Sequence, residues 1–414
     1  MPVQSSPVQS SPVQSSPVRD SVSKSRNSKA LIVTIIAPGG NYGNILQHYA
    51  LQETVKSLGY EVDSIDCPLE QCGKIGVLEK SSKLIDQISK VVQALTGDEY
   101  YRERLFSKLT RREKHLSSEN NPAYIVQREE LFQEFYREYF GNIIHSTYRE
   151  ALTSNSSTWN EYDYVIAGSD QIWNRGIIVT FEALRYYYLE FIEQSRRVNY
   201  APSFGVSSLN FLERLIHRKG LNGFKKLSCR EEEGCDLIRS MTGREAQLVL
   251  DPALLFTAEQ WRKIARKPEY EVPEHYVLEY FFSDTLEPCV KRLAGDLPIV
   301  RAFDERDPSY AKTGPREFVW LVDHADFVIT ASFHGTAFSV ILGKRFISFK
   351  SRWGFSRIRT LLSSCGLTDR IVDLDGDIDS IKFSDKPIDY EAVNSKLQTL
   401  REESMKYLAS CLGK

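Results

Sequence analysis

The sequence has few cysteines and no long apolar run. Its seven cysteines are an odd number, scattered over 414 residues without a Cys-x-x-Cys pair. This spacing argues against a disulfide framework and a zinc knuckle, and it favours a reducing compartment. No apolar stretch approaches the roughly 18 residues that a membrane-spanning helix needs, and the N-terminus carries no apolar signal core. We therefore expect a protein that is soluble, cytoplasmic and not secreted.

The chain also lacks an excess of either charge. Lys and Arg number 53 against 55 Asp and Glu, which gives a formal net charge of −2. A protein that binds nucleic acid through a general basic field needs a positive excess, so no nucleic-acid partner is expected. The balance leaves room for a local basic pocket that binds a small phosphorylated molecule.

Common catalytic and cofactor motifs are absent as well. The chain contains no Gly-x-Ser-x-Gly, His-Glu-x-x-His or Walker A sequence, and its histidines show no metal-ligand spacing. We therefore expect chemistry that does not depend on a bound metal. The sequence has instead a series of apolar segments that end in polar residues.

The chain is longer than one ordinary domain of ~100–200 residues. Residues 3–18 repeat the unit Val-Gln-Ser-Ser-Pro. Ser and Pro at this density cannot bury apolar area, so residues 1–28 are expected to be a disordered leader. The charged, proline-bearing stretch 262–274 is the best linker candidate. It predicts an N-terminal domain over 29–262 and a C-terminal domain over 263–414.

Strand and helix patterns alternate in both domains, which predicts an α/β fold. Apolar, β-branched runs such as 30–37 suit strands that are buried on both faces of a parallel sheet. Helical periodicity at about 73–150, rich in aromatic and charged residues, predicts a helical insertion in the first domain. We predict two Rossmann-like domains that face a cleft, with ligands bound beyond the C-terminal ends of the strands.

The first candidate site segment is the loop 38–44, which separates the first strand from a helix expected over 45–58. It contains Asn41, Gly43 and Asn44. Glycines let the backbone approach a ligand, and the amides of a helix N-terminus favour an anion. A tight turn without a ligand explains the pattern equally well.

The second segment, 168–174, is unusually polar for residues that directly follow a buried strand. It supplies a carboxylate, a hydroxyl, two amides and an indole N–H, from Asp170, Ser169, Gln171, Asn174 and Trp173. A sugar site needs such groups, with an aromatic face for the ring. The alternative is helix capping by Ser169 or Asp170 with Trp173 in the core. Asp170 is the strongest functional candidate of the segment.

Arg230 follows another strand end. A guanidinium suits bidentate binding of phosphate or carboxylate. The alternative is an ion pair with the acidic residues 231–233.

His334 lies between a buried strand and an expected helix over 337–342. The helix N-terminus, the Thr336 hydroxyl and a protonated imidazole would together form an anion site. The downstream residues Lys344, Lys350, Arg352 and Arg357 either add positive charge to this site or form a solvated basic surface.

Six segments in chain order resemble the polysaccharide pyruvyl transferase family. The resemblance covers about residues 30–375, and the six pieces in order are specific although each alone is weak. The segments are Asn41–Gln52, Asp163–Asn174, Tyr200–Gly205, Arg230-Glu231, Asp251–Leu255 and Ser332–Ser339.

This resemblance implies a GT-B-like glycosyltransferase architecture, with the site between two Rossmann-like domains. It also implies transfer of an enolpyruvyl unit from phosphoenolpyruvate to two hydroxyls of a sugar, which gives a cyclic pyruvate ketal and phosphate. The implied partners are phosphoenolpyruvate as donor substrate, without a cofactor, and a polysaccharide or lipid-linked glycan acceptor. An acceptor of the second kind would bring the protein to the inner face of the membrane, in peripheral contact.

The resemblance also implies roles for individual residues. Arg230 and His334 would bind phosphoenolpyruvate, with His334 also as acid, and Asp170 would be the base. The donor side would further include Ser332, Gly335, Thr336, Lys344 and Lys350. The acceptor side would include Asn41, Gly43, Asn44, Gln47, Ser169, Gln171, Trp173 and Asn174. Several family members have an Arg two residues before the histidine, where this chain has Ser332, and the missing cation would come from Lys344, Lys350 or Arg352.

Two other functions fit the same patterns. A glycosyltransferase that uses a nucleotide sugar would suit the two-domain cleft equally well. A non-catalytic glycan-binding assembly protein would instead use the aromatic and charged helices of 73–150 to contact a membrane surface or a partner.

Overall fold

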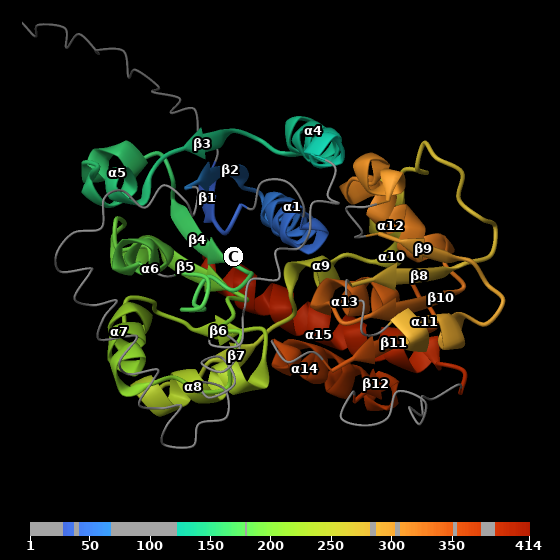
Figure 1. Ribbon diagram of the computed structural model, residues 1–414. Helices are drawn as coiled ribbons and strands as arrows, with labels where there is room; N and C mark the ends of the chain where they lie inside the picture. The colour runs from blue at the N-terminus through green and yellow to red at the C-terminus, as the bar shows by residue number, and fades with distance from the viewer. Residues whose placement is uncertain are drawn as a thin grey trace, which may run out of the picture.

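Two five-stranded parallel sheets, each with helices packed against it, form the body of the protein (Figure 1). The computed structural model describes residues 28–36, 41–67, 122–178, 180–281, 287–302, 307–350, 354–373 and 386–414. The leader expected over 1–28 lies outside these ranges except for its last residue. Residues 73–121 of the expected insertion and Arg352 also lie outside them.

The first sheet has the strand order β3-β2-β1-β4-β5, and every neighbouring pair is parallel. In β1, Leu31 and Val33 pack into one core while Ala30 and Ile32 pack into another. The strand is thus buried on both faces, as its apolar, β-branched run predicts. The strands are β1 (Lys29–Val33), β2 (Glu61–Asp66), β3 (Ile143–His145), β4 (Tyr164–Gly168) and β5 (Arg197–Tyr200).

A short parallel pair, β6 (Ser228–Cys229) and β7 (Gln247–Leu248), lies beside β5. The link is the side chain of Asn199 in β5, whose Oδ1 accepts a hydrogen bond from the backbone N–H of Ser228 at 2.9 Å. The C-terminal ends of β4 to β7 therefore lie along one edge of the first domain.

Helices connect the strands of the first domain, and most begin at a side-chain cap. Asn41, Asn210 and Asp251 each accept a hydrogen bond from a backbone N–H in the first turn of the helix that follows. The helices are α1 (Tyr42–Ser57), α4 (Pro122–Tyr139), α5 (Tyr148–Thr153), α6 (Phe181–Tyr187), α7 (Phe211–Leu221), α8 (Glu232–Thr242), α9 (Pro252–Leu255) and α10 (Ala258–Ile264).

The second sheet has the order β12-β11-β10-β8-β9, again parallel throughout. Helix α11 packs on one face and helices α12 and α13 on the other. Its strands are β8 (Val277–Tyr280), β9 (Ile299–Arg301), β10 (Phe327–Thr330), β11 (Phe346–Phe349) and β12 (Ile371–Val372). Its helices are α11 (Glu287–Ala294), α12 (Pro315–His324), α13 (Phe333–Ile341) and α14 (Phe355–Cys365).

In both sheets the strand order reverses once, between β1 and β4 in the first and between β8 and β10 in the second. Open α/β sheets bind ligands outside the carboxyl ends of the strands at such a reversal. The topology therefore marks two places, one on each domain, where functional residues are expected.

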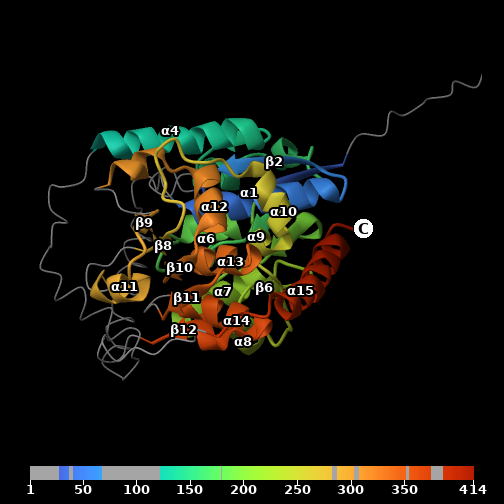
Figure 2. The same ribbon diagram turned by 90° about the vertical axis from the view of Figure 1, so that its right-hand side faces the viewer.

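Helix α1 lies between the two sheets and joins the domains (Figure 1). The ring of Tyr42 stacks on Phe318 of α12 with 4.5 Å between the centroids, and its hydroxyl donates to the carbonyl of Ala302 at 2.9 Å. Arg128 of α4 places its guanidinium 4.3 Å from the centre of the Tyr42 ring. Helix α4 runs along the edge of the molecule beside α1 and α12 (Figure 2).

The last helix, α15 (Tyr390–Cys411), returns from the second domain to the first (Figures 1 and 2). The Tyr407 hydroxyl donates to the carbonyl of Asn199 at 3.2 Å, and the Tyr60 hydroxyl donates to the carbonyl of Leu412 at 2.6 Å. In the part of the chain that the structure describes, no helix has the length and apolar character needed to cross a membrane.

The fold class predicted from the sequence, two Rossmann-like α/β domains, is confirmed. Two local expectations are wrong. Helix α13 begins at Phe333 and not at 337, because Ser332 caps it through a hydrogen bond from the N–H of Gly335 to its Oγ at 3.4 Å. Residues 143–145, expected within a helical insertion, form β3, since half-buried Ile143 and Ile144 pair with β2 at the sheet edge.

Candidate active site

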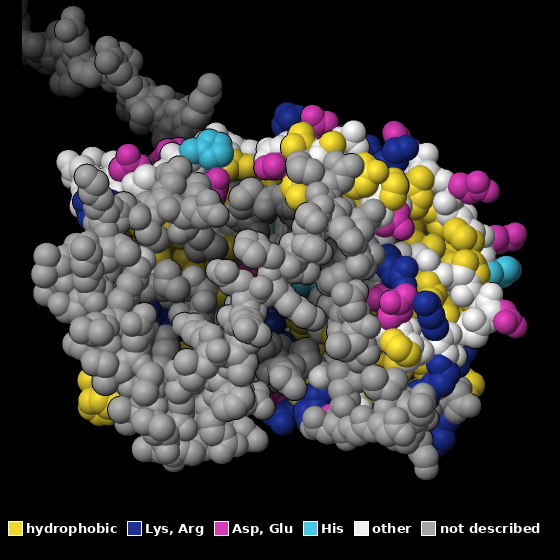
Figure 3. Space-filling model, in the orientation of Figure 1, with side chains coloured by type: hydrophobic (Ala, Val, Ile, Leu, Met, Phe, Trp, Pro, Cys, Tyr) yellow, Lys and Arg dark blue, Asp and Glu magenta, His cyan; other side chains and the backbone are white. Residues whose placement is uncertain are grey.

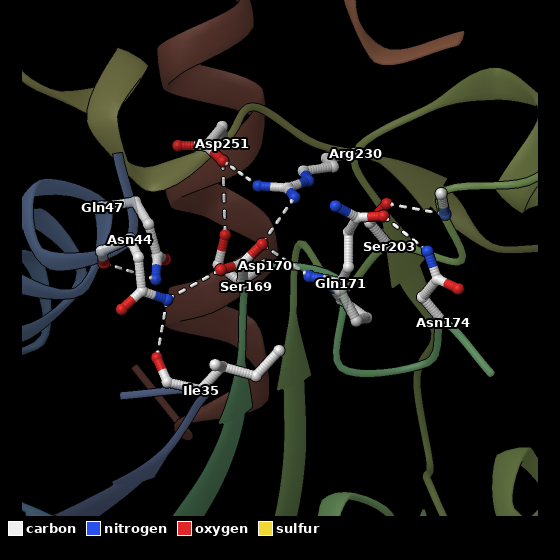
Figure 4. A network of polar contacts seen from close by, with 12 residues as sticks. Ile35, Asn44, Gln47, Ser169, Asp170, Gln171, Asn174, Ser203, Arg230 and Asp251 are labelled. Atoms are coloured by element: carbon white, nitrogen blue, oxygen red, sulfur yellow. Dashed lines mark hydrogen bonds and ion pairs between the residues drawn. The ribbon is translucent and has the colours of Figure 1, made fainter. Parts of the chain in front are cut away.

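Asn44 and Asp170 face each other at the reversal point of the first sheet, where β1 and β4 end (Figure 4). The Asn44 side-chain amide donates to Asp170 Oδ2 at 2.7 Å and to the carbonyl of Ile35 at 2.7 Å. Ser169 and Asp170 have positive φ angles of 45° and 60°, a region that residues other than glycine rarely adopt. Strain of this kind concentrates at functional sites, where the surrounding structure maintains it.

Arg230, at the end of β6, joins Asp170 to a second carboxylate. One guanidinium nitrogen, Nη2, lies 3.3 Å from Asp170 Oδ1, and Nη1 donates to Asp251 Oδ2 (Figure 4). The Arg230 side chain is fully buried. Burial alone would lower the pKa of Arg230, but the two carboxylates outweigh it and raise that pKa above its usual value. Arg230 is therefore a permanent buried cation that fixes both aspartates.

Both aspartates remain ionised at neutral pH. Burial alone would raise the pKa of each, but the charge of Arg230 outweighs it at both carboxyls, helped by Asn44 at Asp170 and by His334 at Asp251. The pKa of Asp170 and that of Asp251 are consequently below their usual range. An ionised carboxylate at Asp170 can accept a proton from a bound hydroxyl group.

His334 lies in the first turn of α13, at the reversal point of the second sheet. Its Nε2 is 3.7 Å from Asp251 Oδ2, so an imidazolium here would face a carboxylate. Gly43 of α1 lies on the other side of the ring, where a Cβ atom would be only 1.9 Å from Nδ1. The imidazole thus fills the space between the two domains, and residue 43 has to be glycine for the ring to fit.

Arg357 of α14 adds a second guanidinium from the second domain. It lies over the Phe333 ring at 5.6 Å, and Arg230 lies 5.3 Å from the same ring. Burial and the charge of Arg230 lower the pKa of half-buried Arg357 to about 10. Among the residues described, no carboxylate lies within ion-pair distance of Arg357 and its Nε has no hydrogen-bond partner. An anion bound here would relieve the repulsion between the two guanidinium groups.

Most of the predicted acceptor-side residues lie around Asp170. Asn41 is exposed and caps α1, with its Oδ1 accepting from the N–H of Asn44 at 3.1 Å. Gln47 is buried one turn further on and donates to the carbonyl of Asn44 at 3.0 Å. The Ser169 hydroxyl donates to Asp251 Oδ2 at 3.4 Å. The structure therefore brings these residues, together with Gly43, into one polar cluster.

The other residues of segment 168–174 support the protein's own structure. Asn174 donates to Gln171 Oε1 at 2.6 Å and so braces the loop. Trp173 is fully buried, with its ring 5.5 Å from Tyr188 and 5.2 Å from Phe204. Trp173 therefore occupies the core and offers no ring face to an acceptor. This is the alternative that the sequence analysis left open for it.

Three of the predicted donor-side residues shape helix α13. Ser332 is its cap, as described above. A Cβ atom at Gly335 would lie 2.2 Å from Thr330 Oγ1, so glycine allows the helix to pack closely on β10. The Thr336 hydroxyl is buried and donates to the carbonyl of Ser332 at 2.9 Å, which directs it away from a ligand.

The predicted lysines do not join the cluster. The Lys344 ammonium donates to the carbonyl of Asp323 at 2.7 Å, and the Lys350 ammonium pairs with Asp373 at 2.6 Å. Of the three downstream basic residues that the structure describes, Arg357 reaches the site. It is the candidate for the cation that Ser332 does not supply.

Asp251 and Glu231 are two buried acidic residues beside the cluster that the sequence analysis did not select. Asp251 binds Arg230 and also caps α9, through a hydrogen bond from the N–H of Ala253 at 3.0 Å. An Asp after a strand and before a proline is a capping pattern, and that signal was available. The sequence left open an ion pair between Arg230 and its acidic neighbours, but Glu231 does not pair with Arg230. Its Oε1 instead accepts from the Ser203 hydroxyl at 2.8 Å and from the Phe204 N–H at 3.0 Å.

The site thus consists of charged groups from strand ends and helix starts of two Rossmann-like domains. Within the described part of the chain, no group of three His, Cys, Asp or Glu side chains is placed to hold a metal ion. A family model described as polysaccharide pyruvyl transferase matches residues 41–351, which include every charged residue of the cluster except Arg357. The chain belongs to the polysaccharide pyruvyl transferase family.

Solved structures of low sequence identity are also similar. A structure described as a putative UDP-N-acetylglucosamine 2-epimerase from Listeria monocytogenes is 9% identical, covers 92% of this chain and 91% of its own, and has a TM-score of 0.45. The UDP-GlcNAc 2-epimerase from Methanocaldococcus jannaschii is 11% identical, with coverages of 90% and 99% and a TM-score of 0.44. The glycosyltransferase SnogD from Streptomyces nogalater is 12% identical, with coverages of 93% and 99% and a TM-score of 0.38. No curated protein matches the chain.

Proposed function

We propose that the protein transfers a pyruvyl group from phosphoenolpyruvate to two hydroxyls of one sugar in a polysaccharide or lipid-linked glycan precursor. The products are a cyclic pyruvate ketal and phosphate, and no cofactor is required. The observation that carries this proposal is the cluster in which Asp170 and Arg230 of the first domain meet His334 and Arg357 of the second. The cluster combines a carboxylate base with the cations that are required by a donor with two anionic groups.

The donor carries a phosphate and a carboxylate, and both need positive partners. Arg357 is the best direct contact, because no described residue pairs with its charge. The backbone N–H groups at the start of α13 would add to the positive field. Arg230 already binds two carboxylates, so its contribution is a fixed charge beside the donor and the orientation of Asp170.

The reaction begins with transfer of a proton from His334 to the methylene carbon of phosphoenolpyruvate. The neighbouring carbon gains positive character, and a sugar hydroxyl attacks it while passing its proton to Asp170. The carbon–oxygen bond to phosphate then breaks and phosphate leaves with the bonding electron pair. The second hydroxyl attacks the same carbon and closes the ketal ring, and its proton returns to the now neutral His334. Asp251 Oδ2 lies 3.7 Å from His334 Nε2 and would help to orient the ring for this transfer.

We also propose that the protein works in the cytoplasm, at the inner face of the membrane when its acceptor is lipid-linked. The described cysteines are all free thiols, five of them buried, as is usual in a reducing compartment.

Mass spectrometry of candidate glycan acceptors incubated with phosphoenolpyruvate tests the function. The expected product is heavier than the acceptor by pyruvate less one water, and phosphate is released only when acceptor is present. A His334→Ala variant should lose turnover, whereas His324→Ala, which changes an exposed histidine of α12, should keep it. Full turnover by His334→Ala would remove the role given to that residue. A hexose-sized mass gain from a nucleotide sugar, with none from phosphoenolpyruvate, would overturn the proposed function.

A further inference from the structure

Helix α7 has an outward face that combines exposed apolar and basic side chains. Phe211, Leu215, Arg218 and Lys219 recur at the spacing of one helix face, and we call them the α7 stripe. Phe211 is 77% exposed, the highest value among the exposed large hydrophobic residues of the described chain, and Leu215 is 47% exposed. Hydrophobic side chains are exposed in the region of α7 at the lower left of the molecule (Figure 3).

The stripe is not needed to hold α7 in place. The opposite face of the helix is buried through His217, Gly220 and Leu221. The one acidic residue of α7, Glu213, is also buried and accepts a hydrogen bond from the backbone N–H of Asn210 at 3.0 Å in a capping box. The exposed face of the helix therefore carries no negative charge, and its two large apolar side chains remain in water.

The positive charge beside these apolar residues is not compensated. Residues 211–226 contain five Lys and Arg and a single acidic residue, in a chain whose net charge is −2. No carboxylate of the described chain forms an ion pair with Arg218 or Lys219. Two acidic residues of the neighbouring segment, Asp236 within helix α8 and Glu245 shortly after it, both pair with Arg239. The surface around the stripe is consequently basic.

The stripe also has a defined position relative to the candidate active site. Helix α7 follows β5, so its first residue, Phe211, lies toward the sheet edge where β4 and β6 deliver Asp170 and Arg230. A surface bound by the stripe would therefore lie on the same side of the first domain as the proposed acceptor.

We propose that the α7 stripe docks the protein on an anionic membrane surface. Phe211 and Leu215 would enter the boundary between headgroups and acyl chains, while Arg218 and Lys219 would contact lipid phosphates. Uncompensated cations beside protruding apolar side chains complement such a surface. The purpose of docking, access to a lipid-linked acceptor, depends on the proposed function, but the docking itself can be measured without turnover.

Co-sedimentation of the full chain with vesicles tests the proposal. The wild-type protein should bind vesicles of phosphatidylcholine with phosphatidylglycerol, bind pure phosphatidylcholine weakly, and dissociate as salt is added. The double variant Phe211→Ser/Leu215→Ser should bind at least about 10-fold more weakly, because it loses the apolar contact. The variant Arg218→Glu/Lys219→Glu should lose about 30-fold or more, because it removes two cations near the surface.

Val126→Glu is the matched control, because Val126 of α4 is 57% exposed and lies outside the stripe. It should bind vesicles like the wild type. All variants should melt at the wild-type temperature and keep wild-type turnover on a short water-soluble acceptor. Absence of wild-type binding to anionic vesicles, or undiminished binding by both stripe variants, would overturn the proposal. If no protein shows turnover, the proposed function fails, and the vesicle result still decides the docking.

Discussion

Replacing Gly43 by alanine would test the contact between the two domains at His334. Gly43 is in the first turn of α1, and the added Cβ atom would lie 1.9 Å from Nδ1 and 2.1 Å from Cγ of the His334 ring. Ordinary van der Waals contact begins at 3.4 Å, so the ring or the helix has to move by about 1.5 Å. The substitution adds no charge and removes no hydrogen-bonding group.

The expected effect on stability is small, because two contributions oppose each other. Alanine is favoured over glycine in a helix by up to about 1 kcal/mol, whereas overpacking costs about 1–3 kcal/mol. The effect on catalysis should be large, because a displacement of about 1 Å at a reacting group can lower the rate about 100-fold. We therefore expect kcat for phosphate release from phosphoenolpyruvate to fall by about 100-fold or more, with the melting temperature changed by only a few degrees.

Gly220→Ala provides the matched control. Its added Cβ atom would lie 2.2 Å from the ring of Tyr188, within the first domain and away from His334. This variant should lose a similar amount of stability but keep the specific activity of the wild type. Turnover by Gly43→Ala within about twofold of the wild type would refute the reasoning that the position of His334 between the domains matters for the reaction.

Three other predictions follow from the charges and burial in the structure. Asp251→Asn leaves a buried guanidinium with one carboxylate fewer, so the free energy of unfolding in urea should fall by about 3 kcal/mol, and an unchanged value would contradict the ion-pair assignment. Arg357→Met should raise KM for phosphoenolpyruvate about 10-fold or more at constant stability, whereas Arg359→Met, on the exposed side of the same helix, should not. The pKa values of His48 and His217 are lowered to about 3 by burial, so both stay neutral in the folded protein while the unfolded chain takes up protons below about pH 6.5. As the pH falls from about 6 to about 4, each histidine should therefore lower the free energy of unfolding by about 1.4 kcal/mol per pH unit. A His48→Gln/His217→Gln variant whose free energy of unfolding falls with pH as steeply as that of the wild type would disprove this.

The fold was predictable because most of its strands are marked by local sequence patterns, namely apolar runs that end in polar residues. The strand end at Asp170 is an example: an apolar run stops, and polar residues follow at the edge where parallel strands deliver their ligand-binding groups. The start of α13 was misplaced because Phe333 and His334 carry no strong helix preference, and a single side chain, Ser332, determines where the helix begins. Strand β3 was missed because three residues at a sheet edge depend on pairing with β2 and not on a long pattern.

The partners within the site were much harder to predict. The sequence places Arg230 next to three acidic residues, yet its partners are Asp170 and Asp251, which lie 60 and 21 positions away in the chain. Lys344 and Lys350 lie close to His334 in the chain, which made them reasonable candidates for cations of the site. Their ammonium groups instead bind the Asp323 carbonyl and the Asp373 carboxylate. Charge attraction acts through space, so chain distance alone cannot select one cation from several.

The return of α15 to the first domain has a consequence for synthesis of the protein. Tyr60 and Asn199 contact Leu412 and Tyr407, which are synthesised 352 and 208 residues later. The first sheet can form while the ribosome is still translating, but part of its surface stays uncovered until α15 has left the ribosome. A truncation before α15, or a ribosome stalled there, would therefore leave an exposed patch on the first domain, which is synthesised before the second.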